Sequence, residues 1–228
     1  MLDTRKYLDI QNEYKPVNFP GYDHPAEFRR LKPTDTLQIS KVIRKSRKSL
    51  MNYLDWADRA GNWSFAQIQK WVMSHINSDD FYRHHFVFLI NKEIVGMCST
   101  APVGDPYQVQ LSYWVADGHQ GRGVGTALAR TIEDFAFRVI GWSAVQINHD
   151  ATNRASGKIP QKLGYTWNGT FEGDNFARGE TGFWYSWIKF RPEGLPPGIL
   201  QGEDPEYFSQ VVTRPEPNEA ETAELSEP

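Results

Sequence analysis

The sequence predicts an α/β protein in which strands and amphipathic helices alternate along most of the chain. Runs that alternate apolar and polar side chains indicate strands, and apolar residues three and four positions apart indicate helices. The 228 residues are enough to bury the core of one large domain. We expect this domain over residues 28–190, after an N-terminal arm (1–27) and before an acidic, proline-rich tail (191–228) that is partly disordered.

Charge is distributed unevenly along the chain. The net charge is −3, but residues 191–228 hold nine acidic and two basic residues, which leaves +4 on residues 1–190. A mildly basic body suits an anionic cofactor, and it is far too weakly charged to indicate nucleic acid. We therefore expect no nucleic-acid partner.

Several features indicate a cytoplasmic protein. The one cysteine, Cys98, excludes an intramolecular disulfide and fits a reducing compartment; we expect it to be buried. Charges interrupt the first 19 residues, which argues against a signal peptide. No stretch approaches the roughly 20 apolar residues that cross a bilayer, so we expect no membrane association.

The first half of the domain contains two predicted helices and a hairpin. A short strand over residues 28–31 precedes a helix that Asp35 or Thr36 caps, with apolar positions at Leu37, Ile39, Val42, Ile43 and Leu50. A second helix follows Ser64. The connector 51–56 between them is unusually apolar and aromatic. Alternation then predicts a hairpin of strands 85–90 and 94–98, which turns at Asn91 and Lys92.

The second half repeats strand and helix before it ends in a hairpin. Strand 108–116 leads to a helix that begins beyond Gly125 and ends near Gly141, and strand 144–149 follows. A short helix over residues 153–163 ends at Gly164, a common terminating residue. Pro160 lies within this helix, where it would be tolerated only in an early turn or at a kink. Strands 165–171 and 182–190 form the final hairpin.

The stretch from Leu111 to Leu128 organises the rest of the chain. Its strand ends at Asp117-Gly118, and a glycine-rich turn, Gln120-Gly121-Arg122-Gly123-Val124-Gly125, leads into a helix. Glycines let backbone N–H groups approach a ligand closely, and N–H groups at a helix start attract phosphate. The pattern therefore indicates a pyrophosphate site, although an ordinary tight turn would have the same glycines.

Several motifs in this order resemble the GNAT superfamily of acetyl-CoA-dependent N-acetyltransferases. The turn at 120–125 matches the superfamily's pyrophosphate motif, Gln/Arg-x-x-Gly-x-Gly/Ala. The segments Asn153-Arg154-Ala155-Ser156 and Leu163-Gly164-Tyr165 are most similar to the Rim-type ribosomal-protein alanine N-acetyltransferases. The resemblance covers about residues 28–190. It implies the GNAT fold, a central mixed, mostly antiparallel sheet that is splayed at the acetyl-CoA cleft and flanked by helices.

The resemblance also implies a site for acetyl-CoA as co-substrate, with no metal. An unpaired strand edge near the splay would hydrogen-bond the pantetheine arm, the turn would hold the pyrophosphate, and Asn153 would contact the arm or cap its helix. The residues expected to bind the cofactor are Trp114, Val115, Gln120, Gly121, Arg122, Gly123, Val124, Gly125, Thr126, Asn153 and Ser156.

The resemblance identifies Ser156 as the residue that would protonate the leaving thiolate. The Rim-type group has a glutamate proposed as general base, but the matching position here is Asn175, which cannot serve as a base. Glu172 and Asp174 are close enough in sequence to replace it. His149 is a further candidate because its ordinary pKa suits a base, although a lone histidine is more often structural.

The connector resembles the tryptophan-bearing loop of the same group, so Tyr53, Leu54 and Trp56 are expected to contact the acceptor. The predicted acceptor is a primary amine, foremost the N-terminal α-amine of a protein such as a ribosomal protein. Two alternatives stay open: acetylation of a small amine (an aminoacyl nucleotide, an antibiotic or a polyamine), and a non-catalytic protein that binds acyl-CoA. The final hairpin and the aromatic arm are surfaces on which a homodimer could form.

Overall fold

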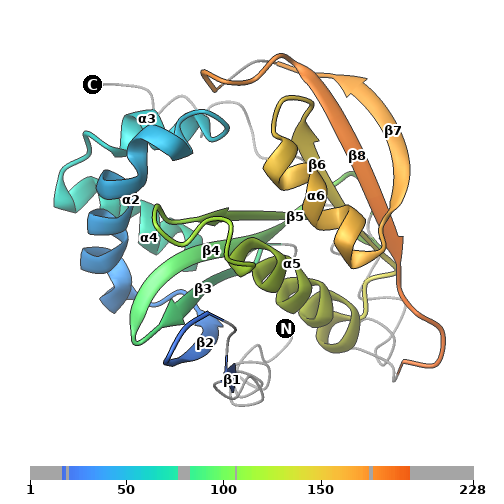
Figure 1. Cartoon of the computed structure of the whole chain (residues 1–228), viewed down its shortest axis with the longest axis horizontal. Helices are drawn as coiled ribbons and strands as arrows, with labels where there is room; N and C mark the ends of the chain where they lie inside the picture. Colours follow the sequence, from blue (N-terminus) through green and yellow to red (C-terminus); the bar gives the residue numbers. More distant parts are fainter. Residues whose placement is uncertain (1–16, 19–20, 77–82, 106, 175–176, 196–228) are drawn as a thin grey trace.

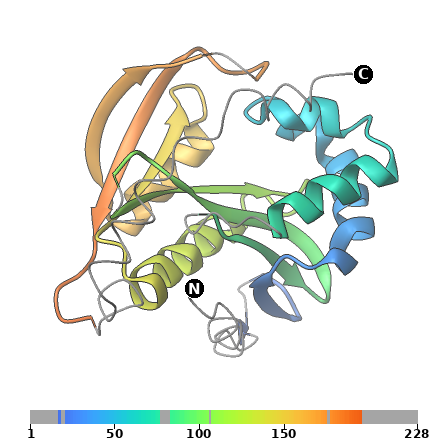
Figure 2. The ribbon, with the colours of Figure 1, turned by 180° about the vertical axis from the view of Figure 1, so that it is seen from behind.

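The computed structural model describes residues 17–18, 21–76, 83–105, 107–174 and 177–195, and Figures 1 and 2 show the arrangement. Its centre is an eight-stranded sheet with the order β1-β2-β3-β4-β5-β6-β8-β7. The strands are β1 (Val17–Asn18), β2 (Pro25–Arg30), β3 (His85–Ile90), β4 (Glu93–Pro102), β5 (Gln108–Val115), β6 (Ala144–Asp150), β7 (Thr166–Glu172) and β8 (Phe183–Phe190). Neighbouring strands are antiparallel except for β5 and β6, which are parallel. The predicted mixed, mostly antiparallel sheet is confirmed.

The helices lie on both faces of this sheet. They are α2 (Thr36–Leu50), α3 (Asp55–Ala60), α4 (Phe65–Ile76), α5 (Val124–Asp134) and α6 (Arg154–Leu163), with the 3-10 turn η2 (Pro33–Asp35) and the π-helix η3 (Phe135–Ile140). Each face has its own buried cluster, because successive strand residues point to opposite sides. Phe86 and Phe88 of β3 pack with α5, η3 and α6, whereas Val87 and Leu89 pack with α2, α3 and α4.

Most predicted elements are present, and the differences have local causes. Strand β2 begins at Pro25 rather than at residue 28, so the last residues of the expected arm belong to the sheet. The connector is not wholly irregular, since Asp55 and Trp56 start helix α3; acidic Asp55 and Asp58 in its first turn suit a helix N-terminus. Pro160 lies inside α6 rather than in its first turn.

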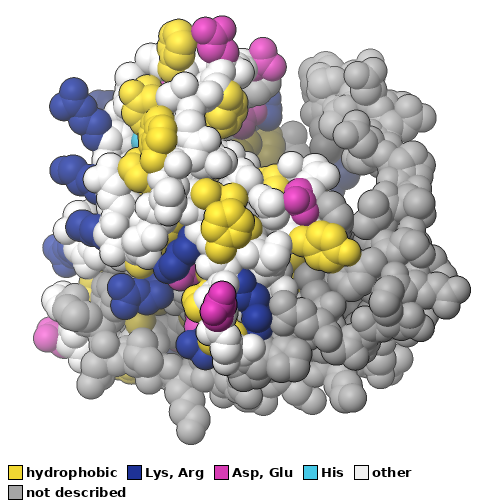
Figure 3. All heavy atoms as spheres, turned by 90° about the vertical axis from the view of Figure 1, so that its right-hand side faces the viewer, with side chains coloured by type: hydrophobic (Ala, Val, Ile, Leu, Met, Phe, Trp, Pro, Cys, Tyr) yellow, Lys and Arg dark blue, Asp and Glu magenta, His cyan; other side chains and the backbone are white. Residues whose placement is uncertain are grey.

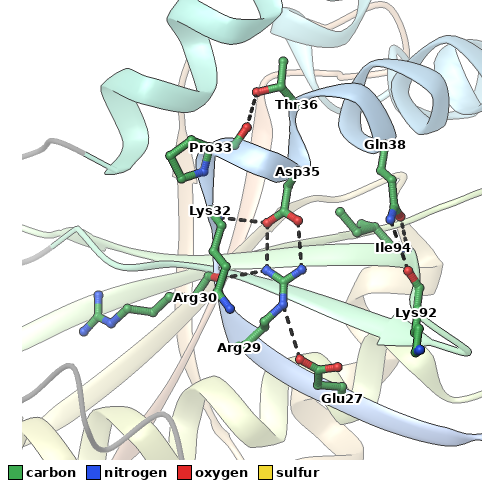
Figure 4. A network of polar contacts seen from close by, with 10 residues as sticks. All are labelled: Glu27, Arg29, Arg30, Lys32, Pro33, Asp35, Thr36, Gln38, Lys92 and Ile94. Atoms are coloured by element: carbon green, nitrogen blue, oxygen red, sulfur yellow. Dashed lines mark hydrogen bonds and ion pairs between the residues drawn. The ribbon is translucent and has the colours of Figure 1, made fainter.

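A partly buried ion pair joins β2 to the residue before α2 (Figure 4). The Arg29 guanidinium donates to both carboxylate oxygens of Asp35 at 2.8 Å, and the backbone N–H of Lys32 donates to the same carboxylate. Two parallel hydrogen bonds fix orientation as well as distance. This pair therefore sets where α2 leaves the sheet.

The β7–β8 side of the molecule carries exposed aromatic residues. Trp167, Phe171, Phe183 and Phe190 are each more than two-fifths exposed, and Figure 3 shows hydrophobic side chains on this face in separate groups. The expectation of a homodimer at the final hairpin stays a prediction. No helix among the described residues is long and apolar enough to cross a membrane.

Candidate active site

The site is organised by the divergence of β5 from β6. The two strands pair only at Gln108–Ala144, Val109–Val145 and Gln110–Gln146, although β5 runs on to Val115 and β6 to Asp150. Beyond the last pair the strands separate (Figures 1 and 2). The sheet is therefore splayed where the GNAT resemblance predicts it.

The splay leaves backbone groups of β5 without a strand partner. Val115 lies opposite Gly96 of β4. The hydrogen bond to β4 is made by the next residue, since the N–H of Ala116 donates to the Val95 carbonyl at 2.9 Å. In an antiparallel pair this alternation turns the N–H and C=O of Val115 away from β4 and toward the gap. The amide of Gln120 donates to that carbonyl at 3.2 Å. Val115 thus presents backbone groups that an extended, amide-bearing ligand can bond.

Trp114 differs from the expectation. The same alternation directs its backbone groups to β4, and its side chain, 9% exposed, packs in the cluster with α2 and α4. Its side chain therefore lies on the opposite face of the sheet from α5 and α6.

The glycine-rich turn leads directly into α5, with Gly123 as the residue before the helix. Gly121 and Gly123 have φ of 72° and 84°, a conformation that only glycine adopts easily. The first helical hydrogen bond runs from Ala127 to Gly123 at 3.0 Å. The N–H groups of Val124, Gly125 and Thr126 therefore have no partner within the helix and lie at its positive end. A cradle of N–H groups next to the splay fits the pyrophosphate of coenzyme A.

Basic and aromatic side chains surround this turn. The Arg122 guanidinium lies 5.7 Å from the centre of the Tyr22 ring, and the Tyr22 hydroxyl is 2.9 Å from Nδ1 of His119. Partial burial, with Arg122 and Lys45 nearby, lowers the pKa of His119. On the other side the backbone N–H of Asp117 donates to Ser46 of α2 at 2.9 Å, which fixes the turn to that helix.

Helix α6 brings Asn153 and Ser156 to the gap. The Asn153 side chain accepts from the N–H of Ser156 at 3.1 Å, so Asn153 is the helix cap. The Ser156 hydroxyl lies 3.1 Å from the hydroxyl of Tyr113 on β5. Burial raises the pKa of Tyr113 to about 12, against the hydrogen bond with Ser156, which lowers it. Tyr113 was not among the predicted site residues; its alternation along β5 with Leu111 and Val115, which share its face of the sheet, was the available signal.

His149 is a structural residue. Its Nδ1 lies 2.9 Å from the carbonyl oxygen of Asp150, and the indole N–H of Trp187 donates to its Nε2 at 3.1 Å. The side chain is buried, and α6 packs on the ring at Gly157. With both nitrogens engaged, this ring has no free position for a proton from an amine.

The expected carboxylates are both exposed. Glu172 ends β7 opposite Phe183, Asp174 lies in the loop after it, and neither bonds Ser156 or Tyr113 among the described contacts. Asn175 lies outside the described residues. The structure therefore assigns no base to this loop, and Glu172 and Asp174 remain predictions.

A different carboxylate, that of Asp150, is buried at the end of β6. It accepts from the N–H and hydroxyl of Thr152 and of Thr181 at 2.6–3.0 Å, and from the N–H of Gly182 at 3.2 Å. Burial opposes ionisation, but these hydrogen bonds prevail and lower the pKa of Asp150 to about 2. Asp150 is thus ionised at neutral pH and holds the β7–β8 loop.

The expected acceptor residues lie at the end of α2 and the start of α3. Tyr53 and Leu54 are half-buried, and Leu54 is the residue before α3. The Trp56 ring centre is 5.4 Å from that of Trp71 and 6.3 Å from that of Trp114. These residues form an aromatic wall on the face of the sheet opposite α6.

The β7–β8 loop reaches this wall from the other half of the chain. The N–H of Gly179 donates to the Asn52 carbonyl at 2.8 Å. Arg178 and Arg47 each donate to one oxygen of Asp58 at 2.6 Å. The loop therefore joins the connector to the end of β6 across the open side of the splay, and none of these contacts was predicted from sequence.

Comparison with known proteins agrees with this geometry. Residues 26–166 match the model of the acetyltransferase (GNAT) domain. The putative ribosomal N-acetyltransferase YdaF of Bacillus subtilis (strain 168) is 22% identical over 172 residues, which are 73% of this chain and 92% of YdaF.

Solved structures share the fold. RimL, a ribosomal L7/L12 α-N-protein acetyltransferase solved with coenzyme A, superposes with a TM-score of 0.66 at 17% identity, over 75% of this chain and 97% of RimL. Spermidine N-acetyltransferase from Vibrio cholerae, solved with coenzyme A and spermine, superposes with a TM-score of 0.61 at 17% identity, over 73% of this chain and 95% of the spermidine enzyme. With the splay, the glycine turn and the matched domain together, the chain belongs to the GNAT acetyltransferase family and is an N-acetyltransferase.

Proposed function

We propose that this protein transfers the acetyl group of acetyl-CoA directly to the N-terminal α-amine of a protein, such as a ribosomal protein. The observation that carries the proposal is the splay of β5 from β6 beside the glycine turn of α5. It provides an open strand edge for an extended ligand and, next to it, N–H groups for an anion. Acetyl-CoA combines both features.

On the donor side, each proposed residue has a separate task. Val115 bonds the pantetheine arm through its backbone, and residues 121–126 hold the pyrophosphate with Arg122 at the entrance. Gln120 contributes indirectly, because its amide is bonded to the Val115 carbonyl. Asn153 fixes the first turn of α6, and this turn presents the Ser156 hydroxyl to the gap.

When bound, acetyl-CoA supplies an activated thioester. The protein's contribution is to hold a neutral amine against it, and positioning of this kind accounts for a large share of many rate enhancements. An α-amine with pKa about 7.7–8.0 is neutral in roughly a tenth of molecules at pH 7, whereas a lysine with pKa about 10.4 is neutral in well under a thousandth. An α-amine substrate therefore depends less on a general base, the role for which Glu172 and Asp174 remain predictions.

The acceptor wall also favours a peptide over a polyamine. Trp56 and Trp71 are partly buried and pack with the buried Trp114, which makes this side apolar, whereas a polycation calls for free carboxylates. The acids of α3 are already paired, Asp55 with Arg59 and Asp58 with two arginines. Asp150 at the end of β6 is bonded to the β7–β8 loop. The names of YdaF and RimL point to the same acceptor class.

Coenzyme A release with a panel of amines tests the proposal. Peptides that begin with alanine or serine are expected to support turnover, and the same peptides with a blocked N-terminus but a free lysine serve as matched controls. Turnover with the blocked peptides would contradict α-amine specificity.

The panel also separates the alternatives. Turnover confined to spermidine or to an aminoacyl nucleotide would identify a small-amine acetyltransferase, as the spermidine enzyme from Vibrio cholerae illustrates. Tight binding of acetyl-CoA without release above background for any amine would identify a non-catalytic acyl-CoA-binding protein. Either result would overturn the proposed function.

A further inference from the structure

Helix α6 contains a carbonyl that its own backbone cannot satisfy. In an α-helix each N–H bonds the carbonyl four residues earlier, and Pro160, four residues after Ser156, has no N–H. The hydroxyl of Tyr113 lies 3.5 Å from the Ser156 carbonyl and 3.1 Å from the Ser156 hydroxyl. Because of Pro160, the Ser156 carbonyl lacks its usual helical hydrogen bond, and the Tyr113 hydroxyl of β5 lies next to that carbonyl.

Tyr113 is suited to donate a hydrogen bond at this position. It lies on the part of β5 that β6 does not pair, and its hydroxyl keeps its hydrogen because burial raises the pKa of Tyr113 to about 12. Ser156 itself is held by the bond from its N–H to Asn153. The two hydroxyls carry two hydrogens. If the hydroxyl hydrogen of Tyr113 points to the oxygens of Ser156, the hydroxyl hydrogen of Ser156 is left to bond a group between β5 and β6.

We propose that Tyr113 is a positioning residue that holds the Ser156 hydroxyl so that it donates to the sulfur of coenzyme A. This inference rests on the proposed function, which puts the thioester beside Ser156. As the C–S bond breaks, its electron pair goes to sulfur, and the Ser156 O–H hydrogen-bonds the developing thiolate. The acceptor nitrogen forms the amide bond and loses one proton, and the sulfur finally gains one.

Binding of coenzyme A and of desulfo-coenzyme A, which lacks the sulfur, tests this assignment without any acceptor. Calorimetry at a pH high enough to ionise part of the coenzyme A thiol should show that the unmodified protein binds coenzyme A about 3–10-fold more tightly than desulfo-coenzyme A, the worth of one hydrogen bond. Tyr113→Phe and Ser156→Ala should each reduce this preference below about twofold and leave desulfo-coenzyme A binding unchanged. Tyr107→Phe, an exposed tyrosine just before β5, is the matched control.

A merely structural Tyr113 would give a different result. Tyr113→Phe would then weaken both ligands equally or retain the preference for sulfur, and either outcome overturns the assignment. Ser156→Ala tests the sulfur contact independently if Tyr113→Phe folds poorly.

Kinetics supply a second readout. Tyr113→Phe should lower kcat about 3–10-fold with an unchanged KM for acetyl-CoA, and the double variant should be no slower than Ser156→Ala, because the two hydroxyls act as one unit. Additive losses would contradict the assignment. If the preference for sulfur is found but no amine is acetylated, the proposed function fails while the positioning role stands.

Discussion

Gly157 of α6 packs against His149 of β6, so replacing it by alanine should have two opposing effects on stability: a gain in helix propensity and a loss from overpacking. A Cβ at Gly157 would lie 2.7 Å from Cε1 and 2.8 Å from Nε2 of His149. The ring cannot turn aside cheaply, since one nitrogen is bonded to the Asp150 carbonyl and the other to Trp187. Gly157→Ala should therefore push α6 off the sheet or break one of these bonds.

The expected magnitude follows from the competing effects. Alanine stabilises a helix interior by roughly 0.5–1 kcal/mol relative to glycine. Overpacking a close contact costs about 1–3 kcal/mol, and a buried donor left unpaired costs a further 1–3 kcal/mol or so. We expect a net loss of about 1–5 kcal/mol, which lowers the melting temperature by several degrees for a domain of this size.

Denaturant unfolding of Gly157→Ala, His149→Ala and the double variant measures this effect. The double variant should lose less stability than the sum of the two single variants, because the new methyl group has space once the imidazole is gone. Lys158→Ala, exposed on the same helix, controls for helix propensity and should change stability by less than about 0.5 kcal/mol. If Gly157→Ala proves as stable as the parent protein, the packing of α6 on His149 is not as described.

Three further predictions concern other contacts. Asp150→Asn should destabilise the protein at pH 7. The folded pKa of Asp150, about 2, lies below its ordinary value, so the stability that this carboxylate contributes is lost as pH falls from about 4 to 2. Unfolding of both proteins at pH 7 and pH 3 should therefore show a smaller difference between them at pH 3. His85→Phe should reduce the loss of stability as pH falls from about 6.5 to 3. Burial, with His75, Arg83 and Arg30 nearby, lowers the pKa of His85 to about 3, so the unfolded chain takes up the proton first. An unchanged slope of stability against pH would exclude His85 as the source of that loss. Gly179→Ala, whose Cβ would lie 2.7 Å from the Asn52 carbonyl oxygen, should lower kcat/KM for the peptide while acetyl-CoA affinity stays within twofold, as steady-state kinetics and calorimetry would show.

Periodicity was sufficient for the elements and their order, because strand alternation and helical spacing are local properties. The splay and the role of the glycine-rich turn were predicted from motif resemblance, and the pairing of β5 with β6 confirms the splay. Helix α3 was missed, since its six residues are too few to show a helical period.

Contacts between distant segments could not be predicted. Tyr113 and Ser156 are 43 residues apart, and Arg178 and Asp58 are 120 apart. Local patterns say nothing about which loop meets which, so a tyrosine in an alternating strand is indistinguishable from a core residue. The same limit applies to the base: a carboxylate chosen by its distance from Ser156 along the chain need not face the gap.

The central claim is that the turn before α5 binds the pyrophosphate of acetyl-CoA, and calorimetry with two glutamate variants tests it most directly. Gly118 and Gly123 share a φ of 84° and both are exposed, so either substitution imposes similar strain and charge. A carboxylate about 4 Å from a phosphate costs about 1–4 kcal/mol, depending on the dielectric. Gly123→Glu should therefore weaken acetyl-CoA binding tenfold or more, and Gly118→Glu by less than about threefold. Normal acetyl-CoA affinity in Gly123→Glu would contradict the claim.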